Sequence, residues 1–374
     1  MRRIALLTLT HDRGKMAAAL AGVAFATTLV LAQIGLYVGF QQNASSLIAY
    51  AGGDLWVMPR GTEVLETADK LSAVSRTVVA SQPCVARVRG LTITFVFSRK
   101  GNGTQDAVMG IGIEPASWPL LPWSLGVGLP QDLLAPNRVA VDRLDLAKLQ
   151  IVGDPRKATL EVGGETVHIA GVTEGIRSFT LTPYVFMTLQ NARRLMRLAD
   201  DQAHYWLVDL KDRRCAKDVV AALEQRPDLQ VRTNDEFRQM TERYWVTGSG
   251  AGTALGFAAL LGLIVGVVIV GQTLYTLTKE HMRELATLKA VGATQLEIVL
   301  FVAWQALFLA VIGGAVGVGM AKGMEHFIAQ AGLNIAIDGG VLLLGAGSIL
   351  LMCGLASLWS IRAVLKLEAA EVFK

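Results

Sequence analysis

The residue types that carry most enzyme chemistry are present in this sequence, but their spacing forms no recognisable catalytic or metal site. A nucleotide hydrolase needs G-x-x-x-x-G-K-[ST], whose backbone amides and lysine hold phosphates, and in the nearest stretch Ala321 directly precedes Lys322. No G-x-S-x-G nucleophile motif occurs. The histidines are scattered without zinc-ligand spacing: His11, His168, His204, His281 and His326. The sequence therefore predicts a non-catalytic chain that binds no metal or cofactor itself; the alternative is an enzyme of an unrecognised kind.

Two glycine pairs have the G-x-G spacing of a phosphate-binding loop, Gly110 with Gly112 and Gly126 with Gly128. A dinucleotide site also needs a third glycine, at the start of a helix that follows a strand. Neither pair has that context, so we interpret both as turns.

The most informative charged segment runs from Thr278 to Thr294, between two long apolar blocks. On a helix of 3.6 residues per turn, its apolar side chains share one side: Met282, Leu285, Ala286 and Leu288. Gly292 follows as a helix stop, and Thr294 with Glu297 forms a T-x-x-E capping box that opens the next helix. The pattern predicts a short rigid helix that could transmit force from a cytoplasmic partner. The alternative is an amphipathic helix that rests on the lipid surface.

The composition indicates an integral membrane protein with one large soluble insert. The 374 residues are 52% hydrophobic and 18% charged, against roughly 25% charged in a soluble domain. The mean hydropathy is +0.43, and the apolar residues gather in four blocks. The net charge of +4 comes from basic residues beside these blocks rather than from a stripe with interleaved aromatics, so we expect contact with membrane lipid and not with nucleic acid.

We predict four membrane spans, because about 20 apolar residues cross a bilayer: residues 16–42, 250–277, 296–321 and 339–361. The first block carries no charge from Met16 until Asp54. A cleaved signal peptide is the alternative, since Ala49-Tyr-Ala51 resembles a cleavage site. However, the apolar run is longer than that of a signal peptide, so we predict an uncleaved anchor.

Basic residues gather at consistent ends of these blocks and so indicate an orientation. They lie in an amphipathic segment at 1–15, in the segment 278–293 and in the tail 362–374, whereas the loop 322–338 holds one, Lys322. Cytoplasmic loops carry the excess of Lys and Arg. Both termini are therefore predicted to be cytoplasmic and residues 43–246 to lie outside.

Residues 43–246 are long enough for a core of their own, which we predict as two α/β lobes. β-branched content and turn residues predict strands at 54–58, 85–98 and 106–113 and a hairpin at 158–171. From Pro183 strands and helices alternate: 184–187, 189–198, 205–210, 215–225, 229–232 and 235 onward. Four prolines between Pro115 and Pro130 indicate a connection between lobes. The predicted fold class is an α-helical membrane protein with four transmembrane helices and a large extracytoplasmic α/β domain between the first and second.

The cysteines form no C-x-x-C pair. Cys353 lies in a predicted span, whereas Cys84 and Cys215 lie in the insert. An extracytoplasmic compartment permits a disulfide, but we interpret Cys84 and Cys215 as unpaired thiols, with a bridge as the alternative.

Small-xxx-small spacing in three spans predicts close approach of helices in lipid. The glycines with this spacing are Gly35 and Gly39, Gly262 and Gly266, and Gly313 and Gly317. No charged residue lies deep in a span, where an ion-coupled transporter usually needs one. The polar exceptions are interpreted as hydrogen-bonding groups between helices: Gln33, Gln272 and Gln305.

One span, a large outer domain and three further spans resemble the FtsX/MacB-type permeases of ABC transporters. The stretch Glu284-Leu-Ala-Thr-Leu-Lys-Ala-Val-Gly292 is similar to that family's E-[YIL]-A-T-L-[KR]-A-[ML]-G signature. Tyr244-Trp245, Gly271-Gln-x-Leu-Tyr275 and His11-Asp12 resemble the DevC-type permeases, which partner an ATPase and a membrane-fusion adaptor to export lipids.

The resemblance implies a homodimer in the bacterial inner membrane, with 278–293 as a coupling helix in a groove of an ABC ATPase. ATP and Mg²⁺ would be bound by the partner ATPase dimer. The residues implied for this contact are Met282, Arg283, Glu284, Leu285, Leu288, Lys289 and Gly292. The apolar ones would fill the groove, the charged ones would set the register, and Gly292 would let the chain turn back.

The function expected from this resemblance is export of a lipidic or amphipathic substrate, with a membrane-fusion adaptor, by mechanical transmission across the membrane. One alternative within the family is mechanical regulation of a periplasmic enzyme or the release of lipoproteins. An alternative of a different class is a stand-alone membrane sensor or scaffold.

Overall fold

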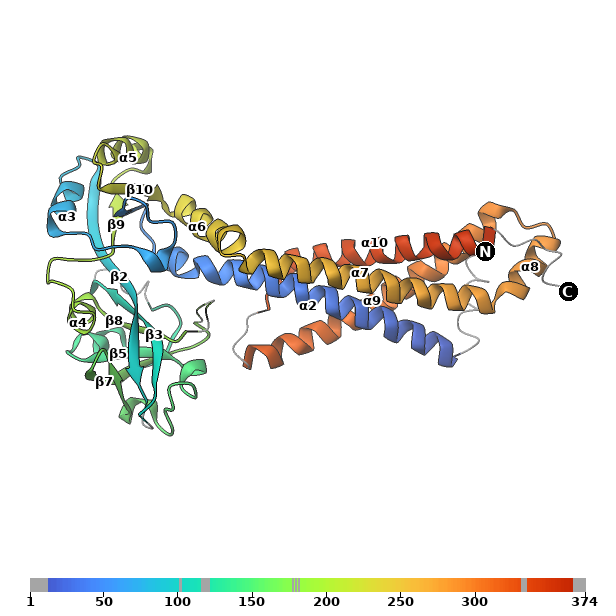
Figure 1. Cartoon of the computed structure of the whole chain (residues 1–374), viewed down its shortest axis with the longest axis horizontal. Coiled ribbons are helices and arrows are strands. Elements are labelled where there is room, and N and C mark those ends of the chain that lie inside the picture. The colour runs from blue at the N-terminus through green and yellow to red at the C-terminus, as the bar shows by residue number, and fades with distance from the viewer. Residues whose placement is uncertain are drawn as a thin grey trace. The chain divides into compact units, whose positions relative to one another are not determined.

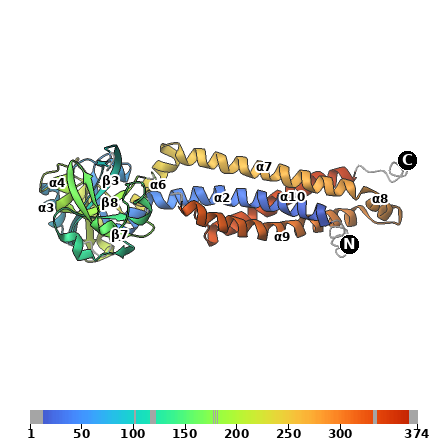
Figure 2. The same cartoon turned by 90° about the horizontal axis from the view of Figure 1, so that it is seen from below.

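The computed structural model describes residues 13–100, 103–115, 122–176, 178, 180, 182–330 and 335–365. The chain divides into two compact units. Gln41–Gly250 is called the outer domain here, and Met1–Phe40 with Ala251–Lys374 is called the membrane unit. The predicted segment 1–15 and tail 362–374 lie largely outside the described residues. Figures 1 and 2 show the elements of the two units.

The described part of the outer domain holds one ten-stranded sheet and short helices. The strands are β1 Leu55–Pro59, β2 Val85–Arg99, β3 Gln105–Ile113, β4 Leu125–Val127, β5 Arg138–Asp142, β6 Thr159–Val162, β7 Glu165–Thr173, β8 Tyr184–Thr188, β9 Tyr205–Leu210 and β10 Leu229–Thr233. Their order is β10-β1-β9-β2-β3-β8-β5-β7-β4, and β6 pairs with both β2 and β7. The α-helices are α3 Ala73–Ala80, α4 Leu189–Leu195, α5 Ala216–Glu224 and α6 Asn234–Arg243.

The predicted strands and the predicted hairpin are confirmed. The hairpin turns at Gly163 and Gly164, whose φ angles of 63° and 87° favour glycine. β4, β5 and α3 are not among the predicted elements: both strands are short, and α3 is a helix of eight residues. Gly126 lies inside β4, so its interpretation as a turn is wrong, whereas Gly128 directly after the strand has a φ of 89°.

The two predicted lobes are the two halves of one sheet. The long strand β2 pairs with β9 through its first half and with β3 through its second half (Figure 1). The pairings β2-β3-β8-β5-β7-β6 return to β2 through Ser98 and Val162, so that six strands form a closed ring. The ring closes only at the end of β2, so the stretch of β2 between Leu91 and Ser98 has no second neighbouring strand. Within the described residues, the two halves are joined by β2; residues 116–121 of the proline-rich stretch, which we interpret as a connection between lobes, lie outside the described part of the chain.

α4 packs closely on the sheet because glycines face it. A Cβ at Gly90 would lie 2.6 Å from Leu189 Cδ2, and Cβ atoms at Gly110 and Gly112 would overlap Met196 and Ala192. Gly110 and Gly112 lie inside β3, so their interpretation as a turn is wrong. The G-x-G spacing here reflects the two-residue period of a strand that faces a helix.

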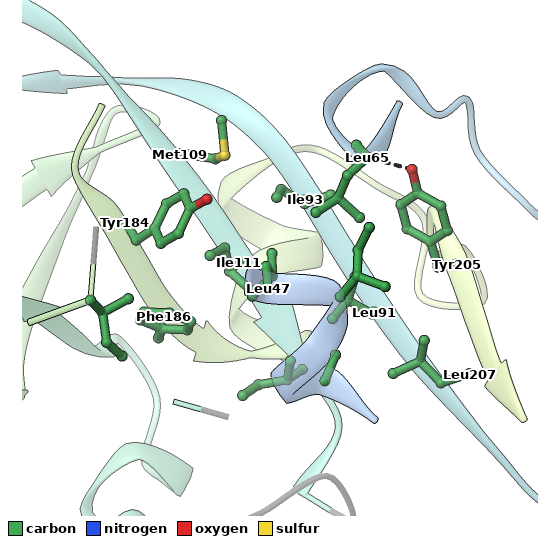
Figure 3. Packing of buried hydrophobic residues seen from close by; sticks show 14 of the residues in the cluster. Leu47, Leu65, Leu91, Ile93, Met109, Ile111, Tyr184, Phe186, Tyr205 and Leu207 are labelled. Atoms are coloured by element: carbon green, nitrogen blue, oxygen red, sulfur yellow. Dashed lines mark hydrogen bonds between the residues drawn. The ribbon is translucent and has the colours of Figure 1, made fainter. Parts of the chain in front are cut away.

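The largest hydrophobic core of the outer domain covers one face of the sheet. Strand residues alternate between faces, and Tyr184 and Phe186 of β8 point into this core together with Leu91 and Ile93 of β2 (Figure 3). Tyr205 donates a hydrogen bond to the carbonyl oxygen of Leu65 at 2.7 Å. The last turns of α2 also contribute apolar side chains, Leu47 and Ile48, to this core.

The membrane unit consists of long apolar helices and one short helix. They are the first part of α2 Arg13–Ala51, then α7 Ala251–Glu280, α8 Met282–Ala290, α9 Gln295–Gln330 and α10 Gly339–Leu365. Among the described residues, four helices (α2, α7, α9 and α10) are long and apolar enough to cross a membrane. α2 continues to Ala51, beyond the predicted end of the first span at residue 42, and α9 continues through residues 322–330, which we predicted as loop.

Candidate functional site

The segment between the second and third spans folds as the short helix α8, bounded on both sides. α7 ends at Glu280, and the His281 ring bonds to the Leu277 carbonyl oxygen at 2.8 Å through Nδ1. Gly292 has a φ of 107°, a conformation that favours glycine and ends the helix. The predicted helix stop is therefore present.

The predicted capping box at the start of α9 is also present. The Glu297 amide donates to Thr294 Oγ1 at 3.3 Å, and the Thr294 amide donates to Glu297 Oε2 at 2.9 Å. Reciprocal bonds of this kind satisfy amides that a helix start leaves without partners. The turn between α8 and α9 is thus fixed at both of its ends.

One side of α8 is anchored on α9 of the same chain. Leu285 is 2% exposed and packs in a cluster with Ile298, Phe301 and Val302, and Leu288 packs partly against that cluster. Leu285 was expected to fill a groove on a partner. That expectation needs correction, because α9 already covers the Leu285 side chain. An i, i+3, i+4 pattern in the sequence identifies the apolar side of a helix, but it does not show which element covers that side.

The opposite side of α8 is exposed. Glu284, Thr287 and Val291 follow one another at spacings of three and four residues, all are exposed, and Val291 is 85% exposed. Met282 and Lys289 lie at the margin and are half-buried. The side chain of Arg283 lies outside the described side chains. Val291 is not among the contact residues predicted from the sequence. Its position next to Gly292, away from the predicted apolar side of the helix, was a signal that could have identified it.

Glycines allow close packing within the membrane unit. A Cβ at Gly313 would lie 2.8 Å from Val23 Cβ, and one at Gly317 would lie 2.6 Å from Thr27 Cβ, so both face α2. Gly35 faces Ile335 at 2.6 Å. On α7, Gly262 faces Gln33 and Gly266 faces Met352, and Gly39 is buried.

The glutamines do not all form the expected hydrogen bonds. Gln33 lies against Gly262, and within the described residues its Oε1 atom has no hydrogen-bond partner. The same holds for Nε2 of Gln305, a residue that is 2% exposed. Gln272 is exposed.

In the outer domain, polar side chains bind the last turn of α2. The buried Arg89 forms an ion pair with Asp209 through two bonds, of 2.8 and 3.1 Å, and donates to the Ala51 carbonyl oxygen at 3.3 Å. Asn234, the first residue of α6, donates to the Ile48 carbonyl oxygen at 3.0 Å. A cation and donors at a helix C-terminus satisfy its free carbonyl groups. The end of α2 is therefore held to β2, β9 and α6, which the sequence did not indicate.

The chain between α6 and α7 is not one regular helix. α6 is followed by a π-helical turn, Tyr244–Gly248, and Gly250 has a φ of 77° before α7 begins at Ala251. Near this turn, in the 3₁₀ turn Leu65–Thr67, burial raises the pKa of Glu66 to about 7. α6, predicted from residue 235 onward, therefore does not continue into α7 as one unbroken helix.

Cys84 and Cys215 form a disulfide, with their Cα atoms 6.4 Å apart. The expectation of unpaired thiols is wrong. The two residues are 131 positions apart, and sequence spacing could not show that the start of β2 and the start of α5 meet. Disulfides persist in oxidising compartments outside the cytoplasm.

Two protein families match this chain. Residues 16–226 match the MacB-like periplasmic core domain, and residues 256–369 match the FtsX-like permease C-terminal domain. An uncharacterised ABC transporter permease of Mycobacterium tuberculosis (strain ATCC 25618 / H37Rv) is 23% identical over 359 residues, which cover 94% of this chain and 93% of that protein.

A second relative is the macrolide export ATP-binding/permease protein MacB of Rhodospirillum rubrum. It is 25% identical over 353 residues, which cover 87% of this chain and 52% of that protein; this chain thus spans about half of its length. The crystal structure of the periplasmic region of MacB from Actinobacillus actinomycetemcomitans aligns with a TM-score of 0.39 and 14% identity, covering 52% of this chain and 95% of that one.

Proposed function

Because this chain belongs to the ABC-transporter permeases that combine a MacB-like periplasmic core domain with an FtsX-like permease domain, we propose that it transmits ATP-driven motion across the membrane. A separate ABC ATPase would supply the motion, and the periplasmic domain would use it to export a lipidic or amphipathic substrate with a membrane-fusion adaptor. The permease acts as a homodimer on an ATPase dimer that holds ATP and Mg²⁺.

The observation that carries this proposal is the two-sided character of α8. Leu285 fixes one side of the helix to Phe301 and Val302 of α9, while Glu284 and Val291 on the other side face solvent. A helix that packs on a membrane span with one side and is exposed on the other can pass a push from a bound partner to that span. An amphipathic helix resting on lipid would instead turn its apolar side to the bilayer.

We assign the partner contact to the exposed side of α8. Glu284, Thr287 and Val291 form the docking surface, and Met282 and Lys289 lie at its margin. Leu285 and Leu288 serve as the anchor to α9, and Gly292 sets the turn. Arg283 belongs to the same short helix, and we assign it to the register of the contact, as the resemblance to the family implies.

The outer end of α2 suits the transmission of motion into the periplasmic domain. α2 is one helix from Arg13 to Ala51, and its last carbonyl groups are held by Arg89 and Asn234. A displacement of α2 would therefore reach β2 and α6 directly. The connection between α6 and α7 would instead bend at Gly250. We therefore assign the main role in transmission to α2.

The proposed orientation places both termini and α8 in the cytoplasm. The basic residues beside the spans support it, as does the Cys84–Cys215 disulfide, which needs an oxidising compartment around the outer domain. The chain would then lie in the inner membrane, with α8 on the side where ATP is available.

Co-purification with a co-expressed candidate ABC ATPase tests the proposal. Val291→Asp should abolish the complex, because a charge would enter an apolar contact. Val152→Asp is the matched control, since Val152 is 93% exposed and lies in the outer domain; this variant should bind the ATPase as the unmodified chain does. An intact complex with Val291→Asp would overturn the assignment of α8 as the docking surface.

A further inference from the structure

A short stretch of β2 has no neighbouring strand on the side opposite β3. Up to Leu91 that side pairs with β9, and at Ser98 and Arg99 it pairs with β6. His204 closes one end of the gap, since its Nδ1 accepts the Ile93 amide at 3.2 Å. The Gly163 amide closes the other end by donating to the Phe97 carbonyl oxygen at 3.0 Å.

The backbone of Phe95 points into this gap. Antiparallel strands bond through every second residue, and on β2 the even-numbered residues face β3, as the bond from the Glu114 amide to the Gly90 carbonyl oxygen shows. The N–H and C=O groups of Phe95 therefore face away from β3, toward the open side. They are a donor and an acceptor spaced as an added strand requires.

The gap opens into a groove of about 490 Å³ between β2, the β6–β7 turn and the end of α4. Phe95 and Phe97 are 49% and 67% exposed along it. The glycines of the turn Gly163-Gly164 have no side chains that could cover the groove. The space beside Gly164 is open, since a Cβ there would meet no atom within 4 Å. The groove is thus open to a partner along the edge of β2.

The charge at the groove identifies the chemistry of its partner. Arg99 is paired with Glu161 at 3.7 Å, but among the described residues the exposed Arg197 side chain forms no ion pair. Thr94 and Gln105 add further polar groups to the lining. This mixture of backbone and charged groups suits a peptide better than an acyl chain.

We propose that this groove docks a short extended segment of a periplasmic protein, which adds to the edge of β2 beside Phe95. The segment would pair its backbone with the N–H and C=O of Phe95, cover Phe95 and Phe97 with apolar side chains, and direct an acidic side chain to Arg197. At about 3.3 Å per residue, the stretch from Ile93 to Phe97 admits about three to five residues. The proposal concerns the outer domain alone and does not depend on which protein binds α8.

Selection from a phage-displayed library of linear heptapeptides on the full-length chain in lipid nanodiscs tests the proposal. We expect one sequence family with an acidic residue and β-branched neighbours. A fluorescent peptide of that family should bind the Arg197→Glu variant about tenfold more weakly, as loss of one charge-assisted bond implies. Replacing the acid of the peptide by lysine should restore binding to Arg197→Glu.

N-methylation of the peptide residue opposite Phe95 separates strand pairing from side-chain contact and leaves the protein unchanged. It should weaken binding by about tenfold or more, because it removes one backbone bond. On the protein side, Phe95→Pro removes the open amide, whereas Phe95→Ala keeps it and should retain more binding. Equal binding of the N-methylated peptide, or no enrichment on the unmodified chain over Arg197→Glu, would overturn the proposal. So would photocrosslinking from p-benzoylphenylalanine at position 97 to phospholipid alone in native membranes.

Discussion

Arg89 donates a hydrogen bond from Nη1 to the backbone carbonyl oxygen of Ala51, 3.3 Å away. The buried guanidinium therefore caps the last turn of α2. The same guanidinium forms an ion pair with Asp209 of β9. One side chain of β2 thus joins the helix that crosses the membrane first to the sheet of the outer domain. In the proposed mechanism, these few bonds would carry the motion of α2 into the outer domain.

Arg89→Ala should destabilise the outer domain by about 2–3 kcal/mol, because it leaves the Asp209 carboxylate and the Ala51 carbonyl without their partner. Thermal unfolding followed by tryptophan fluorescence measures the effect. Arg213→Ala is the control: Arg213 also pairs with an aspartate, Asp54 at 2.8 Å, but its side chain is 89% exposed, so little change is expected. Equal shifts for both variants would show that the Arg89 bonds do not hold the end of α2.

Gly313→Ile should loosen the membrane unit, because a side chain there would enter the space of Val23 on α2. Overpacking of this kind costs about 1–3 kcal/mol. Gly319→Ile on the same helix is the control, since a Cβ at Gly319 would meet no atom within 4 Å. Size-exclusion profiles and melting temperatures in detergent should deteriorate for Gly313→Ile only; similar behaviour of both variants would argue against this helix contact.

The sequence and the structure agree where local patterns decide the outcome. The hairpin at Gly163-Gly164, the helix stop at Gly292 and the Thr294–Glu297 cap all depend on residues a few positions apart, and all three form. The apolar blocks likewise predict the long helices, because only length and composition matter there.

Contacts between distant residues could not be predicted in the same way. The Cys84–Cys215 bond, the burial of Leu285 under α9 and the Arg89–Ala51 bond each need the tertiary fold. Gly110 and Gly112 have the same spacing in a turn as in a strand that faces a helix, so the sequence alone did not separate these two roles. The exposed side of α8 emerged only once the covered side was known.

Glu66 should make the stability of the outer domain depend on pH. Burial raises its pKa from 4.5 to about 7, so the folded state binds more protons than the unfolded state between these values. The contribution of Glu66 to the free energy of unfolding is therefore fully present below about pH 4.5. It is lost as the pH rises through about 7, which lowers the free energy of unfolding by about 3 kcal/mol in total.

Glu66→Gln should therefore remove this dependence and raise the melting temperature at pH 8 relative to the unmodified chain. At pH 4.5 the two proteins should melt at similar temperatures. Melting curves recorded between pH 4.5 and pH 8 provide the measurement. If the unmodified chain gains stability relative to Glu66→Gln as the pH rises, the carboxyl group is not held in its neutral form.

The double substitution Cys84→Ser with Cys215→Ser should lower the stability of the outer domain by about 2–5 kcal/mol, because the bond closes a long loop. Maleimide labelling of the free thiols tests directly whether the bond is present. In denaturant without reductant, the unmodified chain should take up one maleimide, at Cys353, which is the free cysteine. Uptake of three maleimides would show that the bond is absent in the membrane-inserted protein.

Crosslinking from position 291 tests the central claim most directly. Val291→Cys and Val152→Cys are each combined with Cys353→Ser, and each chain is co-expressed with a candidate ABC ATPase and treated with a short bis-maleimide in membranes. The account predicts a permease–ATPase adduct from position 291 and none from position 152. An assembled complex with no adduct from position 291, or with adducts from position 152 instead, would contradict it.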